Sequence, residues 1–195
     1  MKKFLLALII SFAVTAGNFV EAAQFTQEQF DQIVSMTVQN PAVEKNSTLP
    51  VNASTFQTNY NDFMSGFIKE SNATAEDVTK LEQLLLINDP KIFSNDDNRL
   101  FTQNFSNEIV ITGLGKENSN FKVMNFFAMK AEDQNTAIIY LLILRGFVKG
   151  IAPDYDATTL LETIEKNPNA PVIHNGITFT VSSVDNMNIV TAVVN

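Results

Sequence analysis

The fold is decided by the stretch Phe121-Lys-Val-Met-Asn-Phe-Phe-Ala-Met-Lys130 together with the apolar run that follows it. Successive residues of a strand point to opposite faces of a sheet, and both sets of alternate residues are mostly apolar here. Such a pattern is typical of a central strand in a sheet that is covered on both sides. Asn125 interrupts one apolar face. We interpret it as a buried amide whose hydrogen bonds are satisfied in the core, in preference to a polar anchor in a pocket.

The run Thr136-Ala-Ile-Ile-Tyr-Leu-Leu-Ile-Leu-Arg-Gly-Phe-Val148 is predicted as a helix, although its isoleucines also suit a buried strand. Its 13 residues exceed the length of most strands. Asp133 and Asn135 are candidate N-caps, and Arg145 and Lys149 lie near the negative end of the predicted helix. Because the run is apolar on all sides, we expect it to be buried on most sides.

The remaining periodicities place helices and strands in separate groups. The expected order is three helices that begin near Thr26, Ser54 and Thr74, strands over Leu100–Phe105, Glu108–Leu114 and Phe121–Lys130, helices over Thr136–Val148 and Ala157–Lys166, and strands over Val172–His174, Ile177–Ser182 and Asn188–Val194. Lys91–Asn98 is predicted as a polar bend. The order predicts an α+β fold in which N-terminal helices are followed by a mostly antiparallel sheet packed against a long buried helix.

The N-terminus has the layout of a secretory signal peptide. Lys2 and Lys3 form a basic region, Phe4–Ala16 is apolar, and small residues follow at Ala22 and Ala23. Cleavage is predicted after Ala22. A retained membrane anchor is the alternative, but a span needs about 20 apolar residues and this run is shorter. We therefore expect a periplasmic or secreted protein with no stable membrane span after signal cleavage.

The expected domain organisation has three parts. Residues 1–22 are the signal peptide, residues 23–55 hold the N-terminal helix and a connector, and residues 56–195 form a single α+β domain. Within the connector, residues 41–54 have little apolar content and are predicted as a surface loop. A chain of this length is long enough to bury a substantial core.

Charge and composition exclude several classes of function. The 195-residue chain has a net charge of −8, and loss of residues 1–22 would leave 11 basic and 20 acidic residues, a net charge of −9. No run of Lys or Arg offers a basic patch, so nucleic acid is not an expected partner. The absence of cysteine excludes disulfides, thiolate catalysis and Cys-ligated zinc. We predict no cofactor, because Gly113-Leu-Gly115 lacks the third glycine of a phosphate-binding loop.

Two acidic corners of the chain are the candidate metal sites. Asp96 and Asp97 precede Asn98, and Asp154 and Asp156 flank Tyr155. Carboxylate oxygens suit calcium, but neither corner matches the twelve-residue calcium loop. Capping and solvation explain the second corner without any ligand, because Asp156 is also a candidate N-cap of the helix Ala157–Lys166.

No catalytic residue is predicted. His174 is the only histidine, so a His-based metal cluster is excluded. A histidine can act as a general base, but this one lies next to the predicted turn Asn175-Gly176, where polar residues are usually just exposed. A Ser–His–Asp triad would also need a positioned serine, and no Gly-x-Ser-x-Gly motif is present.

The sequence therefore favours an exported, non-enzymatic binding or interaction domain of the bacterial periplasm or cell envelope. Its partner would be an envelope protein or a small ligand, contacted by an open sheet edge or by the second and third helices. The alternative is an exported hydrolase that uses carboxylates on glycans. It requires some of the acidic residues Asp96, Asp97, Asp154, Asp156 and Glu108 to converge in one cleft.

Overall fold

The computed structural model describes residues 25–194, except residues 72, 96, 107 and 168–169. The predicted signal peptide lies outside the described residues. The elements are α2 (Gln27–Val38), the 3-10 helix η2 (Pro41–Glu44), α3 (Ala53–Lys69), α4 (Ala75–Leu85), β1 (Lys91–Asn95), β2 (Asn98–Phe105), β3 (Ile109–Lys116), β4 (Phe121–Met129), α5 (Gln134–Ile151), α6 (Ala157–Lys166), β5 (Val172–His174), β6 (Ile177–Val184) and β7 (Met187–Val194). The predicted α+β class with an antiparallel sheet is confirmed.

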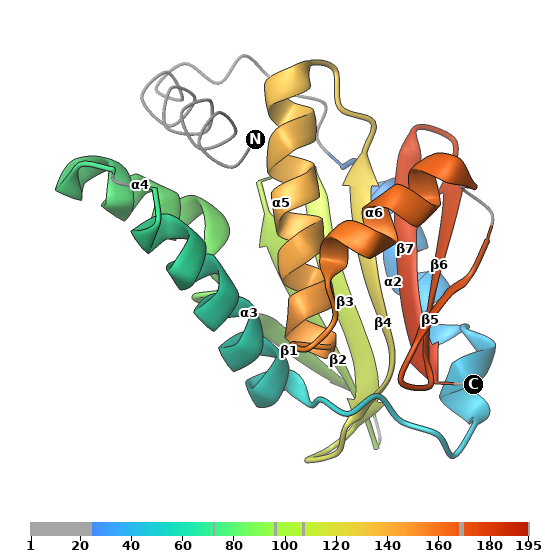
Figure 1. Cartoon of the computed structure of the whole chain (residues 1–195). Helices are drawn as coiled ribbons and strands as arrows, with labels where there is room; N and C mark the ends of the chain where they lie inside the picture. The colour runs from blue at the N-terminus through green and yellow to red at the C-terminus, as the bar shows by residue number, and fades with distance from the viewer. Residues whose placement is uncertain (1–24, 72, 96, 107, 168–169, 195) are drawn as a thin grey trace.

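One seven-stranded sheet organises the described part of the chain. Its strand order is β1-β2-β3-β4-β7-β6-β5, and all neighbouring strands are antiparallel. Helices α3, α5 and α6 lie in front of the sheet and α2 lies behind it (Figure 1). The predicted central strand is confirmed, because β4 has β3 on one side and β7 on the other.

Helix α5 follows β4 and packs against both α3 and the sheet. Asp133 is its N-cap, as predicted, and accepts hydrogen bonds from the backbone N–H groups of Asn135 and Thr136. Phe147 is fully buried, and its ring centroid lies 6.1 Å from that of Phe126 in β4. Helix α5 is buried along one side and around its C-terminal turns. Leu141, on the outer side, is 46% exposed.

Helix α3 packs closely against α5 and lies over β2. A methyl group at Gly146 or Gly150 of α5 would overlap with side chains of α3, including Tyr60 and Phe56. The glycines therefore allow the two helices to approach each other. On the sheet side, Phe56 makes an edge contact with Phe101 at 5.8 Å between ring centroids. The Tyr60 ring lies tilted against that of Phe105, with 5.5 Å between ring centroids, so α3 follows the line of β2.

Helix α2 is held on the opposite face of the sheet by a buried polar group. The Asn125 side-chain amide donates to the hydroxyl of Thr37 in α2 at 3.2 Å, and that hydroxyl lies 2.8 Å from the Thr112 hydroxyl in β3. Thr191 in β7 donates to the Asn125 carbonyl oxygen at 2.8 Å. Asn125 is thus a satisfied core amide, as predicted, and it links α2 to three strands.

Three local predictions were wrong. Lys91–Asn98 is not simply a polar bend, because Lys91–Asn95 pairs with β2 and forms a strand. The connector 41–54 is not wholly a surface loop, because Leu49 and Val51 are buried and their backbones bond to Phe121. Helix α3 is capped by Asn52 rather than Ser54. In the first two cases, contacts with residues distant in sequence decide the outcome, and local propensity cannot report them. The cap of α3 is instead a local contact, because the Asn52 side chain accepts the N–H of Thr55.

The close approach of α3 and α5 predicts opposite effects for two Gly→Ala substitutions in helices. Gly150→Ala places a methyl group against the buried Phe56 ring and should lower the free energy of unfolding by about 1–2 kcal/mol. Gly66→Ala in α3 meets no atom within 4 Å and should raise it by about 0.5–1 kcal/mol. Urea unfolding of both variants measures the difference. Equal or greater stability for Gly150→Ala would show that the two helices are not in close contact.

Candidate functional site

The candidate site is the edge of the sheet formed by β1. Among the described residues, this strand is paired on one side only, with β2. Two neighbouring apolar side chains are largely in solvent, since Ile92 is 56% exposed and Phe93 is 50% exposed. Ile92 shares a face with Phe101, and Phe93 shares the other face with Leu100, because residues paired across a ladder point the same way.

The position of α3 explains why β1 is uncovered. Phe56 and Tyr60 direct this helix over β2, where they cover Phe101 and Phe105. Strand β1 lies one strand further out, beyond the helix that covers β2. Apolar side chains that the fold leaves in solvent at a sheet edge are available for contact with another molecule.

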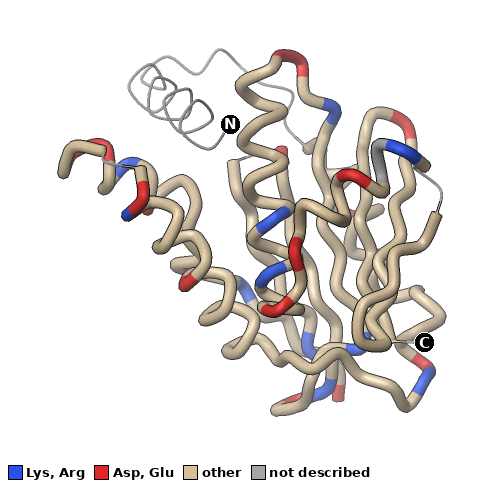
Figure 2. The backbone as a smooth tube through the Cα atoms, viewed as in Figure 1, with Lys and Arg blue, Asp and Glu red and all other residues tan. Residues whose placement is uncertain are grey.

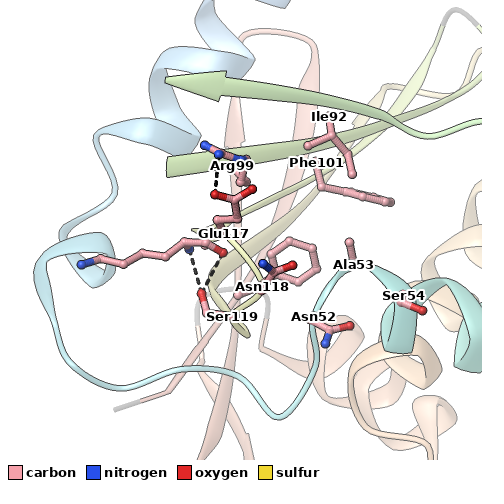
Figure 3. Close-up of a pocket in the computed structure, with 12 residues that line it drawn as sticks. Asn52, Ala53, Ser54, Ile92, Arg99, Phe101, Glu117, Asn118 and Ser119 are labelled. Carbon is pink, nitrogen blue, oxygen red and sulfur yellow. Dashed lines mark hydrogen bonds and ion pairs between the residues drawn. The ribbon is translucent and has the colours of Figure 1, made fainter. Parts of the chain in front are cut away.

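A groove of about 360 Å³ lies beside this edge, on the face that carries Ile92 (Figure 3). Its walls come from three segments far apart in sequence. They are the start of α3 (Asn52, Ala53 and Ser54), the β1–β2 hairpin (Ile92, Arg99 and Phe101), and the end of β3 with the turn into β4 (Gly115 to Ser119, with Phe121).

The rim of the groove is polar and fixed by local bonds. Arg99 forms an ion pair with Glu117 at 2.9 Å. The Ser119 hydroxyl accepts a hydrogen bond from the backbone N–H of Lys116 at 2.9 Å, which holds the turn before β4. An apolar wall at Ile92 and Phe101 with a polar rim suits one side chain of a bound segment rather than a buried cofactor.

The edge carries few of the features that usually prevent strands of different molecules from pairing. Natural edge strands are often protected by charges, proline, bulges or covering loops. Within Lys91–Asn95, Lys91 is the only charged residue, and the register with β2 is regular throughout. The opposite edge, β5, has three residues, and its Ile173 is 62% exposed. The longer edge strand is therefore β1, and it can accept a further strand.

The acidic residues predicted as a metal site do not come together. Asp96 lies outside the described residues. Asp97 is exposed in the β1–β2 turn, where its carbonyl oxygen accepts the N–H of Glu117. Asp156 caps α6, and hydrogen bonds from Thr158 lower the pKa of its carboxyl group. In the described part of the chain, no group of three or more His, Asp or Glu side chains is arranged to hold a metal ion.

Asp154 is engaged by a histidine rather than exposed as a free ligand. His174 Nε2 lies 3.1 Å from Asp154 Oδ2, and the Asn175 amide donates to the same oxygen at 3.0 Å. The His174 ring stacks on Tyr155 with 4.4 Å between ring centroids. Hydrogen bonding to His174 is the main cause that lowers the pKa of Asp154. The cluster joins the α5–α6 corner to β5, and we assign it a structural role.

Glu108 is also used within the fold. Its carboxylate accepts a hydrogen bond from the Tyr140 hydroxyl of α5. Burial, and then this bond, raise the pKa of Tyr140 well above its usual value. Glu108 lies at the β2–β3 turn, whereas Asp97 lies at the β1–β2 turn, so the strand β2 separates them.

Lys and Arg residues are scattered among Asp and Glu over helices, strands and turns (Figure 2).

No described helix is both long enough and apolar enough to cross a membrane. Comparison of the chain with protein-family models, curated proteins and solved structures found no match.

Sequence reasoning missed β1, although a signal was present. Ile92-Phe93 has high strand propensity and is followed by Asn95-Asp-Asp-Asn98, which separates it from the next apolar segment. Asn and Asp between two such segments are typical of a hairpin turn. The exposure of Ile92 and Phe93 had no comparable signal, because it depends on where α3 lies.

The Asp154–His174 contact predicts a pH-dependent effect of Asp154→Asn. A carboxyl group whose pKa is lowered by folding stabilises the folded state above its ordinary pKa of 3.8, and this contribution is lost as the pH falls through the lowered value. The variant should therefore unfold at lower urea concentration than the wild type at pH 7. The difference should disappear in strongly acidic solution. A difference that is independent of pH would contradict the contact.

Proposed function

We propose that this chain is an exported, non-enzymatic binding domain of the bacterial periplasm or cell envelope. It binds by adding a strand of another protein chain to β1. The observation that carries the proposal is the unpaired β1 edge with the exposed Ile92 and Phe93. The signal-peptide pattern of residues 1–22 supports the location.

The energetics of strand addition suit this edge. Backbone groups of an edge strand bond to an added strand, and side chains on each face add specificity. Complete burial of an Ile or Phe side chain contributes about 1.5–3 kcal/mol. Because Ile92 and Phe93 are about half exposed, covering each contributes about 1 kcal/mol beyond the backbone bonds. The groove beside Ile92 offers room for one side chain of the partner.

The alternative of a carboxylate-dependent hydrolase has no comparable support among the described residues. Glycoside hydrolysis requires two carboxyl groups on either side of the bond that is cleaved. Asp154 and Asp156 are engaged by His174 and by the start of α6, and Glu108 is engaged by Tyr140. We therefore propose binding rather than catalysis.

Site-specific photo-crosslinking tests the proposed function. A photoreactive amino acid at position 92 or 93, in cells that express the full chain, should give discrete crosslinked products with another protein chain. Position 173 is the matched control, because Ile173 is at least as exposed as Ile92 and Phe93 and lies on the opposite edge of the sheet. Products at positions 92 and 93 that are no stronger than those at position 173 would refute binding through β1.

A further inference from the structure

We propose that the strand added to β1 is β1 of a second copy of this chain, antiparallel to the first about a two-fold axis through Phe93. The inference rests on the proposed function, because it names the partner at the same edge. It is carried by three properties of Lys91–Asn95: the phase of its backbone, its length and its side chains.

The backbone phase of β1 permits pairing about Phe93. Asn95 and Asn98 lie opposite each other with two residues between them. In such a hairpin the pair that flanks the turn is a hydrogen-bonded pair, and non-bonded and bonded pairs alternate along the two strands from there. Phe93 is then bonded to Leu100 within the chain. Ile92 and Ser94 direct their N–H and C=O groups outward. Across a two-fold axis at Phe93, Ile92 faces Ser94 of the second copy, and each such pair exchanges two backbone hydrogen bonds.

The length of the strand selects this axis over its neighbours. An axis at Phe93 places Lys91 opposite Asn95, so all five residues of β1 are paired. An axis at Ile92 would place Ser94 opposite Pro90, which has no N–H group to donate. An axis at Ser94 would place Ile92 opposite the turn instead of a strand.

The side chains are also self-complementary about this axis. Phe93 faces its own copy as a non-bonded pair, where side chains are closest, and aromatic pairs stabilise such positions. Position 91 faces position 95, and Lys91 is the only charged residue of β1, so no like charges are opposed across the strand pair. The net charge of −8 makes copies of the chain repel each other. Because β1 contains no acidic residue, this strand adds nothing to that repulsion where two copies meet. The contact is small, so we expect a weak, concentration-dependent dimer.

Disulfide trapping tests the register, because the chain contains no other cysteine. In a non-bonded antiparallel pair the Cα atoms lie about 4.5 Å apart, which is within disulfide range. Phe93→Cys should form a disulfide-linked dimer under mild oxidation. Neither Ile92→Cys nor Ser94→Cys alone should do so efficiently, but a mixture of these two variants should. Ile173→Cys, exposed on β5, is the control.

Sedimentation of protein purified from cells that express the full chain provides the second measurement. The wild type should show a monomer–dimer equilibrium, and Phe93→Lys should raise the dimer Kd on the order of 100-fold, since like charges then face each other. At a concentration where the wild type is monomeric, the thermal midpoint of that variant should be close to that of the wild type, because position 93 is half exposed. An unchanged Kd in Phe93→Lys would overturn the inference.

Other results would overturn the inference in distinguishable ways. Trapping of Phe93→Cys with Ile173→Cys would show that β1 pairs with β5 instead. A strictly monomeric wild type that still gives crosslinks from position 92 to a different protein would overturn self-pairing and leave the proposed function standing. A monomer without crosslinks at position 92 or 93 would overturn both.

Discussion

The contact between α3 and α5 determines which strands the helices cover. Gly146 and Gly150 leave room for Tyr60 and Phe56, so α3 lies close beside α5. With α5 fixed over the sheet through Phe147, this spacing places α3 over β2. Strand β1 is then the first strand beyond that helix. The exposed edge is thus a consequence of helix packing and not an isolated surface feature.

The opposite face of the sheet is organised by a polar contact. Asn125 is 2% exposed and joins α2 to β3 and β7 through threonine hydroxyls, which leaves its amide satisfied. A buried amide with unmade bonds would cost stability, so α2 must lie where Thr37 reaches it. Both faces of β4 are therefore covered, and the lateral edges of the sheet are the places where a new strand can add.

Local signals in the sequence predicted most of the elements. Thr26 and Gln29 form the capping box of α2, and Asp133 and Asp156 cap α5 and α6. Asn175-Gly176 makes the β5–β6 turn with positive φ values of 48° and 79°. These features depend on neighbouring residues alone, so the sequence pattern contains the information.

Apart from the cap of α3, the predictions that were wrong concern features that depend on residues far apart in the chain. Whether Lys91–Asn95 is a strand depends on the free edge of β2, and whether Leu49 is buried depends on its bond to Phe121. Likewise, Asp154 was predicted as part of an acidic corner, but the fold brings His174 against it. The candidate edge was anticipated only in general terms, as an open edge of the sheet. Its location required knowledge of where α3 packs.

Amide hydrogen exchange, measured by NMR on dilute protein, tests most directly whether α3 leaves β1 uncovered. The amides of Ile92 and Ser94 should exchange rapidly, and that of Phe93, bonded to Leu100, more slowly. The amides of β4 should be the most protected, because this strand is paired on both sides. Protection of Ile92 and Ser94 equal to that of β4 at low concentration would mean that the edge is already covered. It would contradict the proposed binding surface.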